Sequence, residues 1–172
     1  MKRIFAIALA LVLALSLAAA PAMAASASAL LKSIGHLAHE GEILNCDIAI
    51  KAQYSDVTSE YGKADRESFV KSANGEYATF SKEGVVVGFN KGEEIFELRC
   101  YSKRLHVITE KETVAEFGDP DHRSKSDGQL ILTYNLSNDY QVKFVYDGES
   151  SSSKLAHYNV VWPEGEKSSM AG

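Results

Sequence analysis

Two histidines and a neighbouring glutamate are the first side chains in the sequence with the chemistry to bind a metal ion. His36 and His39 stand three residues apart in GHLAHE, and Glu40 follows directly. Residues at this spacing share one helix face, and imidazole and carboxylate groups are ordinary zinc ligands. The order differs from H-E-x-x-H, and no third ligand stands at a suitable spacing. Both histidines fall in the last turn of a predicted helix, so we interpret them as partners of the helix dipole and expect no metal site.

A pair of carboxylates, Asp119 and Asp121, lies in EFGDPD, residues 116–121. Paired carboxylates can act as general acid and general base. A similar phrase, EYGKAD, occurs earlier at residues 60–65. Because each phrase stands where a short predicted helix ends at a glycine, we interpret it as a helix-ending signal used twice rather than as a catalytic pair.

Nucleophilic catalysis has little support in the sequence. There is no G-x-S-x-G motif and no glycine-rich phosphate loop, and serines cluster at 150–153 and 168–169 in a predicted loop and tail. Cys46 and Cys100 both lie within apolar alternation, which favours burial over catalysis. A disulfide between them and two separate buried thiols are alternatives that stay open. We therefore expect no catalytic residue and no cofactor.

Hydrophobic periodicity divides the chain into helices and strands. An apolar stripe predicts a helix over 30–40 that ends at Gly41, and an extended segment, LNCDIAI, follows. Two shorter helices are predicted at 55–61, capped by Ser55, and at 109–117, capped by Thr109 in a capping box. Hairpin signals then predict four antiparallel strands after each short helix, at 66–72, 76–81, 84–90 and 94–101, and at 121–126, 129–135, 140–146 and 155–162.

The recurring order of elements predicts an α+β fold made of two tandem helix-plus-antiparallel-sheet repeats that share one sheet, with the helices packed on one face. Three pairs of landmarks recur 54 to 56 residues apart: Gly62 and Gly118, Phe80 and Tyr134, Phe89 and Phe144. Near-constant offsets of this kind are typical of a structural repeat. The expected boundaries are an N-terminal helix and extended segment at 25–53, repeats at 54–107 and 108–163, and a flexible tail at 164–172, with 25–163 as one globular domain.

Alternation in the last strands of each predicted repeat separates a polar face of the sheet from an apolar one. The apolar positions include Phe96, Leu98, Cys100, Val142, Phe144, Tyr158, Val160 and Trp162. The polar positions are Glu97, Arg99, Tyr101, Gln141, Lys143, His157 and Asn159. A sheet with one solvated face has this pattern without any further function. An open face rich in Tyr, Arg, His and Asn nevertheless has the composition of a recognition surface, so these seven residues are the candidate binding site.

The N-terminus has the features of a cleaved signal peptide at residues 1–24. Lys2 and Arg3 precede an almost wholly apolar run, and Ala22 and Ala24 occupy the small-residue positions before a cleavage site at Ala25. Loss of the two cations leaves 16 basic and 23 acidic side chains, so the formal charge falls from -5 to -7. We expect a secreted protein that does not bind nucleic acid and does not stay inserted in the membrane after cleavage.

Four stretches together resemble the YjgB-type family of small exported Gram-positive proteins, which is built around a domain of unknown function. They are LNCDIAI, YGKADRESFV, YATFSKEGVVVGFNKGEEIFELRCY and FGDPD, and the resemblance covers Leu30 to Trp162. The family implies no catalytic residues. The helix-then-sheet order also resembles the architecture of β-lactamase-inhibitor proteins and of small outer-membrane assembly lipoproteins, a likeness of topology alone.

These observations favour an exported, non-enzymatic binding module that uses the polar sheet face to bind an unknown protein or a cell-envelope polymer. The alternative is a cell-envelope hydrolase whose site is assembled from distant residues such as His106, His122 and His157. A purely structural envelope protein is a third interpretation. A deep cleft that holds two histidines and a carboxylate would favour the enzyme, whereas a gently curved sheet would favour binding.

Overall fold

The computed structural model describes residues 26–71, 73–136 and 139–168, with side chains described as far as residue 166. The expected signal peptide and its cleavage site before Ala25 lie outside the described residues. Within the described part of the chain, no helix has the length and apolar character needed to cross a membrane.

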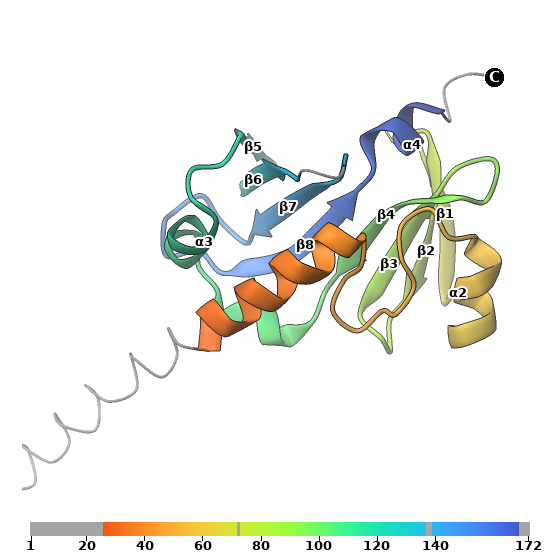
Figure 1. Cartoon of the computed structure of the whole chain (residues 1–172), viewed down its shortest axis with the longest axis horizontal. Coiled ribbons are helices and arrows are strands. Elements are labelled where there is room, and N and C mark those ends of the chain that lie inside the picture. Colours follow the sequence, from red (N-terminus) through yellow and green to blue (C-terminus); the bar gives the residue numbers. More distant parts are fainter. Residues whose placement is uncertain (1–25, 72, 137–138, 169–172) are drawn as a thin grey trace, which may run out of the picture.

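One eight-stranded antiparallel sheet forms the centre of the molecule, with strand order β1-β2-β3-β4-β8-β7-β6-β5. Each half is a four-stranded meander, and the halves join where β4 pairs with β8 (Figure 1). The strands of the first half are β1 Arg66–Val70, β2 Gly75–Phe80, β3 Val85–Phe89 and β4 Ile95–Cys100. The strands of the second half are β5 His122–Ser126, β6 Gln129–Asn135, β7 Gln141–Tyr146 and β8 Leu155–Val161. The α+β class and the antiparallel sheet predicted from the sequence are confirmed.

Three helices cover one face of this sheet. The first described helix, 26–40, crosses the middle of the sheet beside β4 and β8, whereas α2 (Tyr54–Tyr61) and α3 (Glu110–Phe117) lie toward its two ends (Figure 1). Helix 26–40 buries Leu31 and Ile34 completely, against a core that includes Leu98 and Val160. This side is called the helix face below, and the opposite side is called the open face.

The two related phrases, EYGKAD and EFGDPD, make matching contacts. Their glycines both end a helix with φ of 80°. The aromatic rings pair in the same way, since Tyr61 lies 5.8 Å from Phe80 and Phe117 lies 5.3 Å from Tyr134 between ring centroids.

The final aspartates of the two phrases also match. Asp65 accepts a hydrogen bond from the backbone N–H of Ser81 at 2.7 Å, and Asp121 accepts one from Asn135 at 2.8 Å. Each phrase therefore ends a helix and fixes the end of the hairpin that follows. Superposition of the two halves as a repeat, and the likeness to β-lactamase-inhibitor architecture, stay predictions.

The strand registers disagree with one of the three residue pairs that were matched between the two halves, Phe89 and Phe144. Thr79 lies opposite Val86 in the first half, and Thr133 lies opposite Lys143 in the second. Counting along each strand from these pairs, Phe144 corresponds to Val87 rather than to Phe89. The β6–β7 connection is longer than the β2–β3 connection, which shifts the offset after the hairpin.

Several local predictions are wrong in detail. Helix α2 begins at Tyr54 with Gln53 as its N-cap, so Ser55 is not the cap. The sequence left a short strand and an extended segment open after Gly41; no strand forms there, and the segment runs through turns and isolated bridges, with the backbone N–H of Lys51 donating to the carbonyl of Ile95. The sequence pattern missed the 3-10 helix η1 (Lys103–Val107) and also α4 (Pro163–Ser168), which begins at the last residue of the expected second repeat and continues into the expected tail.

Cys46 and Cys100 are free thiols in the structure, and both are buried. Burial raises the pKa of both thiols, which lowers the fraction of reactive thiolate. The disulfide stays a prediction for protein from an oxidising environment. Alkylation after unfolding, followed by mass spectrometry, tests it. Bridged protein takes up no alkyl group, whereas two added groups contradict the bridge.

Gly118 should resist substitution because of its backbone conformation rather than its surroundings. A Cβ added at this position would have open space around it, with no contact inside 4 Å beyond its chain neighbours. However, φ is 80° with ψ of -163°, a region that essentially only glycine adopts. We expect Gly118→Ala to lower the free energy of unfolding by about 1 kcal/mol or more.

Gly35→Ala is the matched control. Gly35 lies inside helix 26–40, and an added Cβ would meet Phe117 at an ordinary 3.4 Å. This variant should be neutral or more stable by up to about 1 kcal/mol. Urea denaturation of the two variants measures both effects, and equal stabilities would contradict the backbone argument.

Candidate functional site

A buried carboxylate organises the centre of the open face. Glu97 on β4 is only 6% exposed, although it lies on the side of the sheet opposite the helices. Its carboxylate accepts four hydrogen bonds, from Tyr77 Oη at 2.5 Å, Arg99 Nε at 2.9 Å, Arg99 Nη2 at 3.0 Å and Asn159 Nδ2 at 2.8 Å. Charge-assisted bonds of this kind are the strong ones in proteins, so the carboxylate holds three neighbouring side chains in fixed positions.

The Arg99 guanidinium is held from two directions. It forms the bidentate ion pair with Glu97, and its Cζ lies 4.5 Å from the centroid of the Tyr77 ring. Burial, followed by the Glu97 charge, raises the pKa of Tyr77, so this hydroxyl is a neutral donor. The Arg99 side chain nevertheless keeps 27% of its surface exposed. A fixed, partly exposed guanidinium is therefore presented on the open face.

An aromatic stack lies beside this ion pair. The rings of Tyr101 and His157 are nearly parallel, with centroids 4.5 Å apart and an interplanar angle of 20°. Burial and then the Arg99 charge lower the pKa of His157 to about 4. His157 is therefore neutral near pH 7. Tyr101 is 42% exposed, so the stack offers an apolar ring surface next to the charged group.

Asn159 completes the cluster from β8, between Arg99 on one side and Lys143 on the other. Its amide nitrogen faces Glu97, which directs Oδ1 away from the carboxylate. Oδ1 is buried and accepts no hydrogen bond from any residue that the structure describes. A buried acceptor without a donor destabilises a protein by about 1 to 3 kcal/mol. The cluster therefore contains a polar atom that the fold itself does not satisfy.

A β-bulge changes the position of one predicted residue. Glu97 lies opposite Gly88 and Ile95 lies opposite Phe89, so Phe96 has no partner on β3. Phe96 is fully buried, but against Tyr77, with ring centroids 5.9 Å apart at 90°. The prediction that Phe96 belongs to the helix face is therefore wrong. The bulge turns it toward the open face, where it helps to bury Glu97.

Two of the seven predicted site residues are buried, namely Glu97 and Asn159, and Tyr101 is exposed. The other four are half-buried: Arg99, Gln141, Lys143 and His157. Five of the seven form the cluster just described. Sequence reasoning missed Tyr77, and the signal available was its place in the alternation of β2, which puts it on the same face as Glu97.

Gln141 and Lys143 lie outside the cluster and line an open hollow of about 420 Å³ over β5, β6 and β7. Gln141 donates to Asn135 at 2.9 Å, so its amide is engaged within the hollow. Asp121, His122 and Thr133 also line it. The hollow continues the open face from the central cluster toward the β5 edge.

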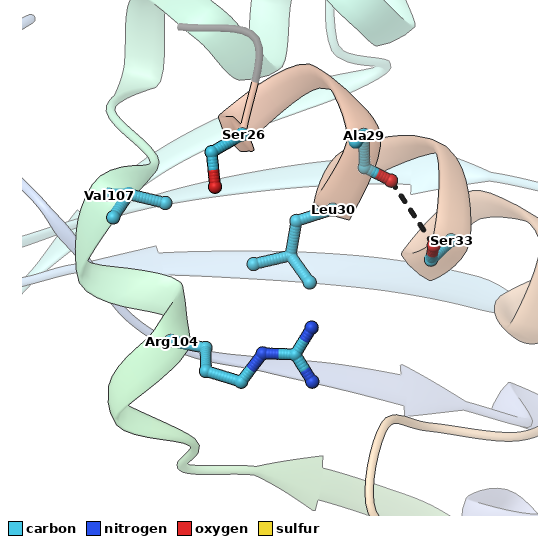
Figure 2. A pocket seen from close by; sticks show the side chains of 6 residues that line it. All are labelled: Ser26, Ala29, Leu30, Ser33, Arg104 and Val107. Atoms are coloured by element: carbon cyan, nitrogen blue, oxygen red, sulfur yellow. Dashed lines mark hydrogen bonds between the residues drawn. The ribbon is translucent and has the colours of Figure 1, made fainter. Parts of the chain in front are cut away.

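A second hollow, of about 320 Å³, lies on the other side of the molecule between helix 26–40 and η1. Figure 2 shows Leu30 and Arg104 at its centre, with Ser33 donating back to Ala29 of its own helix at 3.1 Å. Its lining has one charged group and small side chains. It does not contain the polar groups that the open face brings together.

The histidines singled out in the sequence do not gather. His106 is exposed on η1, and His122 on β5 lies three strands from His157 on β8, which is about 14 Å at the usual strand spacing. Among the residues that the structure describes, no group of three His, Cys, Asp or Glu side chains is arranged to hold a metal ion. The polar cluster around Glu97 thus contains no metal-binding set, and its fixed side chains suit binding a ligand.

The architecture defines an α+β protein with one open antiparallel sheet and helices on a single face. The family model described as "Domain of unknown function (DUF4309)" matches residues 31–161, so the chain belongs to the DUF4309 family. The predicted relation to YjgB-type proteins is thereby confirmed.

Two solved structures are similar. The DUF4309 family protein YjgB from Bacillus subtilis has a TM-score of 0.61 and 18% identity, over 79% of this chain and 97% of that one. An extracellular protein containing an SCP domain from Bacillus anthracis has a TM-score of 0.50 and 7% identity, over 65% of this chain and 43% of that one. At these identities the likeness concerns the fold alone. No curated protein matches the sequence.

Glu97 should be important for stability because its charge is buried and paired. We expect Glu97→Gln to lower the free energy of unfolding by about 3 kcal/mol, since it leaves Arg99 without its counter-charge. Replacement of Arg99 should also lower the free energy of unfolding, because it leaves the buried Glu97 carboxylate without its counter-charge. The same replacement at a fully exposed position would change stability little.

Glu149→Gln is the control for Glu97→Gln, because Glu149 pairs with Lys125 at 2.7 Å while both side chains stay largely exposed. Its effect should be within about 1 kcal/mol. Urea denaturation compares the two variants. If Glu97→Gln were no worse than Glu149→Gln, the buried cluster would not contribute to stability.

His157 should make stability depend on pH. Its pKa is about 4 in the folded protein, against an ordinary value of 6.5, so the unfolded chain binds the proton more readily. The stabilisation that neutral His157 adds to the free energy of unfolding is complete above pH 6.5. It falls as the pH decreases toward 4, by up to about 3 kcal/mol.

The variant His157→Gln should lose this part of the pH dependence. His36→Gln, at an exposed position of helix 26–40, is the matched control. Thermal unfolding from pH 7 to pH 4 measures both. Equal slopes for His157→Gln and the unsubstituted protein would contradict the assignment.

Proposed function

We propose that this protein is an exported, non-enzymatic binding module that takes its ligand on the open face of the sheet. The observation that carries the proposal is the Glu97 cluster, which holds Arg99 and Asn159 on the side opposite helix 26–40, α2 and α3. Fixed polar groups next to an exposed aromatic ring are typical of recognition surfaces, because little conformational entropy is lost on binding.

Export is supported by the N-terminal sequence. Lys2 and Arg3, the apolar run and the small residues Ala22 and Ala24 form the pattern of a cleaved signal peptide. The ligand that we propose for an exported protein is another protein or a polymer of the cell envelope.

The absence of enzymatic activity is part of the proposal. A hydrolase needs a nucleophile or an activated water together with a base within hydrogen-bonding reach. His157 is fixed in a stack with Tyr101, and His122 lies strands away from it. The Glu97 carboxylate is fully occupied by four donors, which favours a positioning role for it over proton transfer.

The test compares two exposed aromatic residues on opposite faces. Tyr101 is 42% exposed on the open face. Phe69 is 54% exposed and lies on the helix face, since Glu67 two residues earlier bonds to Tyr54 of α2. Tyr101→Ser should weaken binding to cell-envelope material and secreted proteins of the host about tenfold or more, whereas Phe69→Ser should not.

The measurement is co-sedimentation with isolated envelopes together with capture from culture medium. Circular dichroism shows that both variants fold. If folded Tyr101→Ser protein binds as well as the unsubstituted protein, the open face is not the site.

A further inference from the structure

Basic side chains form a row across the open face, at one register of the sheet. Arg66 on β1 lies opposite Thr79, which lies opposite Val86, which lies opposite Arg99 on β4. Residues directly opposite each other in neighbouring strands point to the same side. Arg66 and Arg99 therefore share the open face.

The row continues through the second half of the sheet. Asn159 joins Arg99 to Lys143, and Thr133 joins Lys143 to His122 on β5. Both register shifts lie beyond these pairs, so the row is regular over all eight strands. We call Arg66, Arg99, Lys143 and His122 the basic row.

Acidic side chains are few at the strand positions of the same surface, although Asp121, just before β5, lines the hollow with Lys143 and His122. The chain has 23 Asp and Glu residues, yet on the open-face positions of strands β1 to β8 the one acid is Glu97. The other two acids within these strands, Glu67 and Glu76, belong to the helix face by alternation. Glu97 is neutralised by Arg99. The net positive charge of the row therefore comes from Arg66 and Lys143, with Asp121 as the acidic side chain at its β5 end.

The cations of the row keep free donors. Arg99 uses Nε and one N–H of Nη2 for Glu97 and also interacts with Tyr77; a guanidinium has five N–H groups, so donors remain on its exposed part. Arg66 is exposed and Lys143 is half-buried, and neither forms an ion pair within the described chain.

Spacing decides the size of the ligand. Neighbouring strands are about 4.8 Å apart, so Arg66 lies about 14 Å from Arg99, and Lys143 about 10 Å further on. A small anion cannot reach from Arg66 to Lys143. A chain that carries repeated negative charges and lies across the strands contacts all of them.

We propose that the basic row binds an extended anionic polysaccharide, laid across the strands with its acidic groups at Arg66, Arg99 and Lys143. This inference rests on the proposed binding function and names its ligand class. A sugar chain is favoured over a sugar-free polyanion because Tyr101 presents an exposed ring face beside Arg99, on which the C–H face of a sugar ring can stack.

The experiment measures dissociation constants for three polymers by isothermal titration calorimetry. Polygalacturonate has sugars and charge, dextran has sugars without charge, and inorganic polyphosphate has charge without sugars. Polygalacturonate should bind most tightly, and its affinity should fall as salt is raised. The double variant Arg66→Gln/Lys143→Gln should bind it about tenfold more weakly at low salt.

The matched control is Lys32→Gln/Lys111→Gln, which removes the same charge from exposed positions on helix 26–40 and α3. It should bind as the unsubstituted protein does. Equal weakening by both double variants overturns the row as the site. Equal binding of dextran overturns the role of charge, and equal binding of polyphosphate overturns the role of the sugar.

The two proposals fail separately. If polygalacturonate does not bind, but Tyr101→Ser still loses binding to envelope material, the ligand class is wrong and the open face remains the binding site. If Tyr101→Ser also keeps its binding, both proposals are overturned.

Discussion

The pairing of β4 with β8 is the contact on which the rest of the structure depends. Each half of the sheet is a meander that could bury little by itself, and this pairing joins them into one surface. On the helix face it brings Leu98 beside Val160, so a single core runs under all three helices. On the open face it brings Arg99 beside Asn159, and the polar cluster forms at that junction.

On the open face, one set of residues both contributes to stability and holds polar and aromatic groups at the surface. A buried ion pair is weak evidence for stability, because desolvation offsets much of the attraction. The Glu97 cluster also buries Asn159 Oδ1 without a donor among the described residues. A simpler apolar patch would cover Phe96 and Val161 without that loss. The cluster is better understood as a device that fixes a guanidinium and an aromatic stack at the surface, next to the basic row.

Most of the elements could be predicted because their signals are local. Alternation, the hairpin signals and the helix-ending glycines depend on neighbours within a few residues, and all eight strands lie close to their predicted bounds. The candidate site was predictable to the extent that it follows the pleat, which placed Arg99, Tyr101 and His157 on one face. The bulge at Phe96 was not predictable, since it arises from the fit between β3 and β4.

The sequence by itself determined the fold class, the strands and the polar side of the sheet, because side-chain periodicity is a property of each segment alone. Tertiary structure decided the order in which strands from the two halves meet, and with it every contact of the site. Glu97 and Asn159 are 62 residues apart, yet their hydrogen bond is 2.8 Å long. No local pattern specifies that contact, because it depends on β4 and β8 being neighbours. The two strands are neighbours because the helices bury their apolar stripes against one continuous sheet.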